Sequence, residues 1–400
     1  MTRCVLLWLL VLTSITPAQP ASSAADHADH WFGRSLEDFA VDLWTVAARP
    51  RSRNRCLAPL PIQMILGQLG EGPGNGGSRL SFASRFRHRT APMSELPRYL
   101  KRLTRPGVDG HGLRPFHELW FDSELHLIPL FEQRFHHRYG SKAPRFDRAK
   151  TPRDIRDAAN KTVQKAMNGS VPDLLAVDPK LERGRIIAAT ALLFSGQWLQ
   201  PFDPKLTRSR AFRLPAKGRD KMVAMMSAGA GNYQVYEDSE VKAVALRIAT
   251  HTDFALQIVM AKRSLARLEM RNDVARWRRW HRQSKRRKLP GLHIPRFSVS
   301  YHGDLGASLV HLGVVDSTVD RAVDYGFFQT AISTPLASFA HLTSLSIDEA
   351  GLRPATTNAP ATRPGPWDRV KGLIINRPFL FALRDWKTGG ILLLGRVLEP

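Results

Sequence analysis

The chain has 400 residues, 43% hydrophobic and 24% charged, so it can bury a sizeable core and shows no compositional sign of disorder. Its formal net charge is +24, from 59 Lys and Arg against 35 Asp and Glu. Arginines outnumber lysines, which favours a polyanionic partner because the guanidinium group offers paired donors to phosphate and sulfate. Two cysteines are too few for a disulfide scaffold or a multi-cysteine zinc module.

The N-terminus is typical of a secretory signal peptide. Arg3 precedes an apolar run at residues 4–12 that is too short to span a bilayer, and small residues follow, with cleavage expected after Ala18 or Ala24. We expect residues 1–24 to be removed, residues 25–400 to form a single domain, and the mature protein to be secreted and extracellular with Cys56 as its thiol. The alternative is a buried N-terminal helix. No other apolar stretch reaches about 18 residues, so no membrane anchor is expected.

The first half of the chain is mainly helical in pattern. A 3.6-residue apolar period predicts an amphipathic helix at 31–48, and a buried helix is expected at 57–69. The loop 70–77 contains a GxGxxG match, but a helical pattern precedes it and Pro73 interrupts it, so nucleotide binding is not expected. A strand begins near 118, and helices are predicted at 129–139 and 151–175.

Strands dominate the second half. The continuous apolar run 186–198 predicts a strand buried on both faces, and alternating strands fill 221–260. A very basic helix is predicted at 273–288. Strands follow at 292–300 and 373–399, the latter broken by a hairpin turn at 385–390, and 354–366 is an exposed extended loop. Helices and strands alternate without a βαβ rhythm, which indicates the α+β class.

Four segments carry a family resemblance in their order and spacing: AANKTV through NGSVPDLL at 158–175, TALLFSGQW at 190–198, IDEAG at 347–351 and NRPFLF at 376–381. Together they resemble the serpin superfamily, closest to its plasminogen activator inhibitor and protein C inhibitor branch. Several residues differ from the family's motifs, as described below, and such differences are typical of a divergent or viral member. The resemblance implies three β-sheets, about nine helices and an exposed reactive-centre loop.

The same resemblance implies a serine protease inhibitor that acts as a suicide substrate on an extracellular protease, without a cofactor and as a monomer. The loop is cleaved and then inserts as a new strand into the main sheet, carrying the acylated enzyme with it. The residues give no sign of an enzyme: neither HExxH nor GxSxG is present, and the fourteen histidines show no zinc spacing.

The expected hinge departs from the inhibitory pattern. The resemblance places it at Glu349, Ala350, Gly351, Leu352, Arg353 and Pro354. Inhibitory members have Thr or Ser and then small residues after the glycine. Here Leu352 is bulkier, and Pro354 lacks the N–H that a central strand requires, which argues against insertion. The alternative is therefore a non-inhibitory serpin-fold binding protein: a carrier, decoy or immune modulator.

Four residues are candidates for the position of the reactive bond. Counting at the family's spacing from each end of the loop gives Gly365 and Trp367. Arg363 precedes a proline, which trypsin-like proteases cleave badly, and Arg369 lies close to the sheet.

Three residues match the region where the family's main sheet opens. Trp198 stands at the breach position. His341 stands at the shutter position, with Thr190 where Asn is usual. Because Ala58 and Pro61 replace the usual hydroxyl residues, His341 is either part of a hydrogen-bonded cluster or an ordinary packed strand histidine.

The segment 271–288 carries nine cations: Arg271, Arg276, Arg278, Arg279, Arg282, Lys285, Arg286, Arg287 and Lys288. On a helix, Arg271, Arg278, Arg282 and Lys285 would share one face. The segment resembles the basic helix with which protein C inhibitor engages heparin, so a glycosaminoglycan partner is expected. The alternative is a solvated cationic face, and the signal peptide makes nucleic acid an unlikely partner.

Two further features concern the surface. A second basic cluster comprises Arg79, Arg85, Arg87, His88 and Arg89. Two sequons place candidate glycosylation sites at Asn160 and Asn168, of which Asn168, at a helix exit, is the better candidate because Asn160 falls inside the predicted helix.

Overall fold

The computed structural model describes residues 24–49, 52–72, 85, 92–171, 173–176, 181, 184–214, 220–250, 253–312, 323–330, 333–334, 336–354 and 371–400. All of the predicted signal peptide except Ala24 lies outside these residues, as do the four candidates for the reactive bond, Arg363, Gly365, Trp367 and Arg369.

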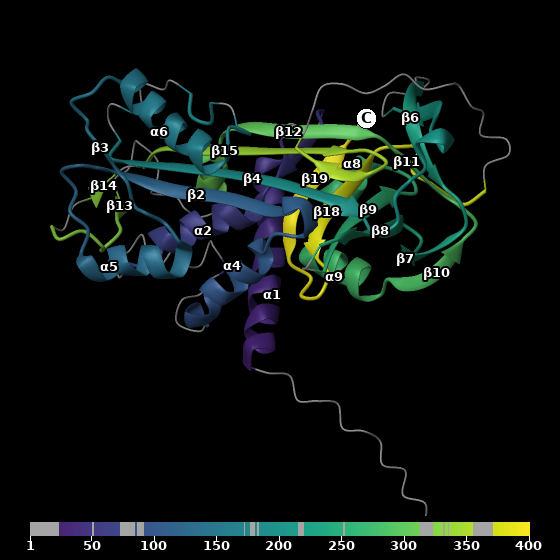
Figure 1. Cartoon of the computed structure of the whole chain (residues 1–400), viewed down its shortest axis with the longest axis horizontal. Coiled ribbons are helices and arrows are strands. Elements are labelled where there is room, and N and C mark those ends of the chain that lie inside the picture. The colour runs from purple at the N-terminus through teal and green to yellow at the C-terminus, as the bar shows by residue number, and fades with distance from the viewer. Residues whose placement is uncertain are drawn as a thin grey trace, which may run out of the picture.

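The main sheet runs along the length of the molecule (Figure 1). Its strands, from one edge to the other, are β3 (Arg145–Phe146), β2 (Gly112–Asp122), β4 (Ile186–Trp198), β16 (Gly351–Arg353), β15 (Leu336–Ile347) and β12 (Phe297–Asp304). β4 pairs antiparallel with β2 and parallel with β15, and the short β16 lies between β4 and β15 at one end.

The second sheet packs against the main sheet. Its order is β1 (Arg55–Leu57), β19 (Ile391–Val397), β18 (Phe379–Asp385), β9 (Phe254–Ala261), β8 (Val241–Ala249), β7 (Gly231–Glu237) and β10 (Lys285–Leu289). Every residue of β18 and β19 is buried, which explains why their sequences are apolar apart from Arg384, Asp385 and Arg396. The two sheets are joined where Trp198 of β4 pairs with Ile248 of β8.

A third sheet and a small ribbon complete the strands. The third sheet has the order β17 (Leu373–Ile374), β11 (Leu292–Pro295), β6 (Asp220–Ala228) and β5 (Arg208–Arg213). The ribbon pairs β13 (Val323–Asp324) with β14 (Ser333–Thr334). The predicted three-sheet α+β architecture is therefore confirmed.

Eight α-helices occur in the described part of the chain: α1 (Ala24–Ala47), α2 (Pro59–Leu69), α4 (Leu96–Thr104), α5 (Pro129–Arg134), α6 (Pro152–Ala166), α8 (Leu265–Met270), α9 (Val274–Arg282) and α10 (Gly306–His311). Short 3-10 turns occupy Met93–Glu95, Val108–Gly110 and Pro204–Leu206, and a π-turn occupies Phe135–Tyr139.

Helix α6 is shorter than the helix predicted for 151–175. It begins at a capping box in which Thr151 and Asp154 bond reciprocally. It ends at Ala166 because Asn168 and Gly169 adopt left-handed backbone angles, with φ of 50° and 70°. Ile155, Ala159 and Val163 of this helix pack against the main sheet.

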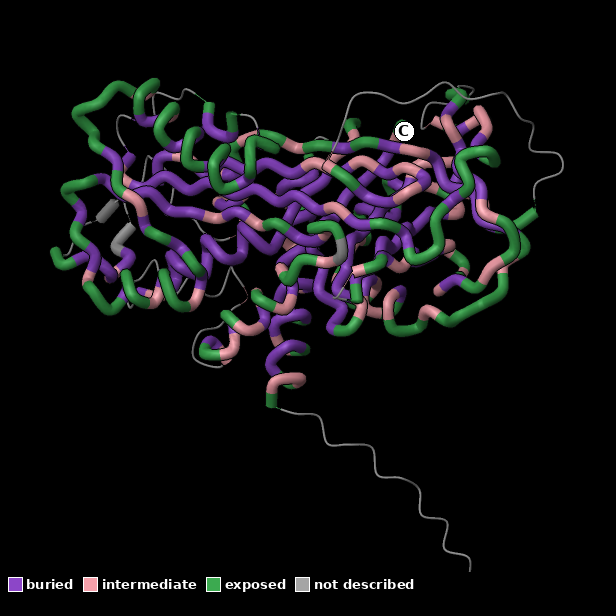
Figure 2. Tube along the Cα trace, viewed as in Figure 1, coloured by how far each residue is buried: buried purple, intermediate pink, exposed green. Residues whose placement is uncertain are grey.

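Alternation along β4 explains why its sequence reads as one apolar run. Ile187, Ala189, Ala191 and Leu193 pack with α6 on one face. Leu192 and Phe194 face the core between the main and second sheets, and α2, buried throughout, lies on that inner side (Figures 1 and 2). Both faces of β4 are therefore covered, and the end that carries Phe194 leads to the hinge.

Candidate functional site

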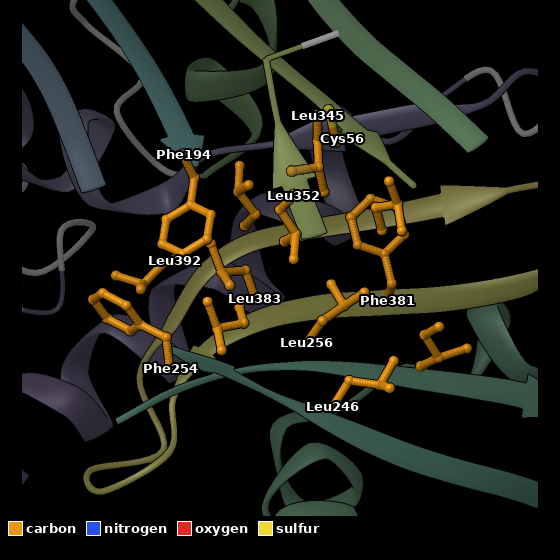
Figure 3. Packing of buried hydrophobic residues seen from close by; sticks show 14 of the residues in the cluster. Cys56, Phe194, Leu246, Phe254, Leu256, Leu345, Leu352, Phe381, Leu383 and Leu392 are labelled. Carbon is orange, nitrogen blue, oxygen red and sulfur yellow. The ribbon is translucent and has the colours of Figure 1, made fainter. Parts of the chain in front are cut away.

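The hinge is already part of the main sheet. Strand β16 places Leu352 opposite Gly196 of β4 on one side and opposite Ile347 of β15 on the other. The Leu352 side chain is 0% exposed, and it lies among Phe194, Leu345 and core residues of the second sheet (Figure 3). The bulkier residue that the sequence presented as a departure is therefore accommodated as a core side chain.

Insertion of the hinge stops after three residues. β16 ends at Arg353, and the half-buried Pro354 follows as a bend. Beyond that point β4 and β15 pair directly, from Leu193 opposite Ser344 to Ile186 opposite Leu336. Further insertion would require these two strands to separate, and Pro354 would enter the sheet without an N–H to donate.

A tight turn connects β15 to β16. The Asp348 carboxylate accepts hydrogen bonds from the backbone N–H of Ala350 at 2.9 Å and of Gly351 at 3.0 Å. Glycine is required at 351 because a Cβ there would lie 2.0 Å from the carbonyl oxygen of Gly196. The turn therefore delivers the backbone of β16 into close contact with β4.

Glu349 fixes this turn to the rest of the molecule. Its two carboxylate oxygens each lie 2.9 Å from Nε of Arg296, and Thr207 donates a further hydrogen bond. Burial would raise the pKa of Glu349, but the hydrogen bonds from Arg296 and Thr207 outweigh burial and lower the pKa below its usual value. Glu349 is therefore held as a carboxylate.

Trp198 joins the end of β4 to the hinge, as expected for the breach position. Its indole Nε1–H donates to the carbonyl of Asp348 at 2.8 Å, and its backbone N–H donates to Ala350 at 2.9 Å. Phe202 packs edge-on against the indole and donates its backbone N–H to Glu349 at 3.0 Å.

His341 belongs to a hydrogen-bonded cluster beneath the main sheet. Its Nε2 accepts from the backbone N–H of Ala58 at 3.1 Å, so Nδ1–H is left to donate to Oγ1 of Thr190 at 2.9 Å. The Thr190 hydroxyl donates in turn to the carbonyl of Ala340 at 3.0 Å. Burial lowers the pKa of His341 to about 3, so the ring is neutral. A backbone amide thus replaces the hydroxyl partner that Ala58 cannot supply.

The basic segment 271–288 is not one helix, and that prediction is wrong. Helix α9 ends at Arg282, and Lys285–Leu289 forms strand β10, paired antiparallel with β7. A continued helix would have brought Arg278, Arg282 and Lys285 onto one face, where like charges destabilise it. In a strand, successive side chains point to opposite faces, which spreads the charge.

The cations of this segment differ in what they contact. Arg276 pairs with Glu240 at 2.6 Å, and Arg278 pairs with Glu37 at 3.1 Å and with Asp38. Arg271 reaches Glu240 at 3.7 Å but is 72% exposed. The remaining cations are exposed: Arg279, Arg282, Lys285, Arg286, Arg287 and Lys288. We call Arg282 together with Lys285–Lys288 the β10 patch.

The structure also bears on the two candidate glycosylation sites and on the second basic cluster. Asn160 is buried and makes three hydrogen bonds, accepting from the N–H of Leu174 and Leu175 and donating to the carbonyl of Leu175, so it offers no room for a glycan in the folded chain. Asn168 is exposed and stays a candidate. Of the second basic cluster only Arg85 is described, and it is paired with Asp42; Arg79, Arg87, His88 and Arg89 lie outside the described residues.

Sequence reasoning missed the residues that anchor the hinge. Asp348 could have been found, because an Asp three residues before a Gly is a turn signal. Arg296, Thr207 and Gly196 could not, because nothing in their local sequence indicates that they meet the hinge.

In the described part of the chain, no group of three or more His, Cys, Asp or Glu side chains could hold a metal ion. A membrane-spanning length of apolar helix is also absent from the residues described.

The architecture and the hinge define a three-sheet protein whose hinge pairs within the main sheet as a short additional strand. The sequence profile of the Serpin (serine protease inhibitor) family matches residues 34–400, and the chain belongs to this family.

Relatives and solved structures agree with this assignment. Human Serpin B8 is 24% identical over 372 residues, which cover 90% of this chain and 97% of that protein. Serpin48 of the insect Tenebrio molitor superposes with a TM-score of 0.77 at 19% identity, covering 95% of this chain and 100% of that one. Human thyroxine-binding globulin, in complex with thyroxine, also gives a TM-score of 0.77, at 21% identity, covering 93% and 99%.

Proposed function

We propose that this chain is a secreted serine protease inhibitor that presents residues 355–370 as bait to an extracellular protease. The observation that carries the proposal is the hinge itself: Gly351–Arg353 already pairs with both β4 and β15. The first step of loop insertion is therefore built into the fold, and the core accepts Leu352. The apolar N-terminal run at residues 4–12 supports secretion.

In this proposal the protease serine attacks a bond within the loop and forms an acyl-enzyme. The loop then follows β16 between β4 and β15, which must give up their direct pairing. Each inserted residue leaves solvent and pairs with a strand on either side. The enzyme, which is attached to the loop as the acyl-enzyme, is carried along.

A second candidate is a serpin-fold binding protein that does not trap proteases. Pro354 favours it, because β16 ends one residue before this proline, where the next ladder hydrogen bond would be lost. Thyroxine-binding globulin, whose structure in complex with thyroxine is similar to that of this chain, is an example of this fold holding a ligand.

Cleavage of the loop distinguishes the two candidates. A non-target protease nicks the chain between Ala355 and Arg369, and thermal unfolding of intact and cleaved protein is compared. Inhibition by insertion requires a large rise in midpoint after cleavage. If the wild-type midpoint does not rise but that of Pro354→Thr does, the proline blocks insertion, and the binding-protein candidate stands.

We also propose that the β10 patch binds a heparin-like polyanion. Its side chains are exposed: Arg282 ends α9, and Lys285–Lys288 project from both faces of β10. On a heparin column, Arg287→Ala lowers the salt concentration at elution. Arg278→Ala has a smaller effect because Glu37 and Asp38 already neutralise that charge. Equal effects of the two variants would contradict a site on β10.

A further inference from the structure

A further cavity of the structure is lined by neither hinge residues nor residues of the β10 patch. It is a groove of about 1330 Å³ between the C-terminal residues, the β9–α8 connection, the start of β1 and the far ends of β5 and β6. Figure 1 shows the C-terminus beside β6, and Lys221 of β6 contacts Glu399 at 2.8 Å. Its charged lining is mainly cationic: Arg53, Arg213, Lys221, Arg263 and Arg377.

The acidic residues that line the groove are already paired. Glu269 binds the buried Arg396 at 2.7 Å, and Lys221 contacts both Glu399 at 2.8 Å and the terminal carboxyl oxygen of Pro400 at 3.1 Å. Among the described residues, none of the four arginines of the groove lies within ion-pairing distance of a carboxylate. Asp220 stands opposite Arg213 in the β5–β6 register without reaching that distance. The adjoining stretches 50–51 and 215–219 contain no Asp or Glu. The groove therefore carries excess positive charge.

Two of these arginines make the most specific feature. Arg377 donates through one terminal nitrogen to the carbonyl of Lys262 at 3.1 Å. Its Nε is buried and has no hydrogen-bond partner within the described part of the chain. Burial and the positive charge of Arg213 both lower the pKa of Arg377, so the two guanidinium groups are close enough to repel.

An oxyanion between the two guanidinium groups would relieve their repulsion. It would screen the repulsion, and a tetrahedral phosphate or sulfate offers several oxygens to such forked donors. We propose that this groove binds a small molecule bearing phosphate or sulfate groups, held between Arg213 and Arg377 with Arg53 and Arg263 along its walls. None of the residues that line the groove belongs to the hinge or to the β10 patch.

Calorimetric titration at low ionic strength tests the site with two probes, inorganic pyrophosphate and a trisulfated heparin disaccharide. We expect saturable one-site binding of at least one probe, and the tighter of the two identifies the phosphate or sulfate source. Arg213→Ala, at an exposed side chain, should weaken binding about tenfold or more. Arg377→Lys should also weaken it, because lysine keeps the charge but lacks the Nε donor and the fork.

The control is Arg153→Ala on α6, which removes one exposed positive charge outside the groove and should leave affinity unchanged. The proposal is overturned if neither probe saturates, or if Arg213→Ala and Arg153→Ala bind equally well. If Arg377→Lys does not fold, Arg213→Ala still decides the outcome. The fall in heparin retention caused by Arg287→Ala reports on the β10 patch, and the fall in probe affinity caused by Arg213→Ala reports on the groove, so either site can fail without the other.

Discussion

Truncation of Leu352 to alanine tests whether the hinge is seated in the main sheet. Leu352 is fully buried between β4 and β15, in the cluster that joins the main and second sheets. Arg353, the next residue of the same short strand, has a side chain that is 58% exposed and lies 3.8 Å from Asp348. The two residues therefore form a matched pair on one element, with one side chain in the core and the other in solvent.

The expected cost follows from burial. Truncating a fully buried leucine to alanine costs about 2–5 kcal/mol when the surroundings cannot relax. The hinge can leave the sheet, so the cost cannot exceed what its insertion contributes. Burying a leucine contributes about 1.5–3 kcal/mol, and the ladder hydrogen bonds add to that. We therefore expect Leu352→Ala to lower the free energy of unfolding by about 2–3 kcal/mol.

Urea unfolding followed by circular dichroism measures this difference. Arg353→Ala should change the free energy of unfolding by less than about 0.5 kcal/mol, because its ion pair is exposed. If the two variants lose the same stability, the side chain of Leu352 is not in the core, and the argument that the hinge is pre-inserted fails.

Three further predictions concern the supporting residues. Glu349→Gln should lower the free energy of unfolding by about 1.5–3 kcal/mol near neutral pH. Because the pKa of Glu349 is lowered in the folded state from 4.5, its contribution is complete above that value and disappears as the pH falls below it, so wild type and variant should converge in acid urea titrations. Thr190→Val leaves Nδ1–H of His341 without an acceptor, and urea unfolding should report a loss of about 1–3 kcal/mol. When secreted from eukaryotic cells, the Asn168→Gln variant should have a molecular mass lower than that of wild type by one glycan, with little change in stability. An unchanged molecular mass would exclude this site.

The long apolar segments of the sequence were sufficient to predict the main strands of the fold. The apolar run of β4 and the NRPFLF segment that opens β18 are long, strongly patterned and buried on both faces, so their strands were predicted correctly. The end of α6 was misplaced because a left-handed Asn168 ends a helix without any break in the amphipathic pattern. The basic segment was misassigned because Lys and Arg tolerate a helix, whereas pairing with β7, a distant segment, decides in favour of a strand.

The site was only partly predictable. Trp198 and His341 were identified through the resemblance, and their hydrogen bonds fit the expected positions. The interpretation of Leu352 as an obstacle came from its size alone, and its full burial in the core cluster shows that a leucine fits. Arg296 lies 53 residues from Glu349, so their contact could not be read from the sequence.

Strand β10 has a consequence for how copies of this protein meet one another. In the described part of the chain it pairs with β7 alone, so its other side presents open backbone donors and acceptors that could accept a strand from another molecule. Its four cations and the proline that follows oppose this, because two such edges repel each other and Pro290 cannot donate. High salt or a bound polyanion weakens that repulsion. The protection against self-association is therefore electrostatic, and it declines under the conditions in which the patch is neutralised.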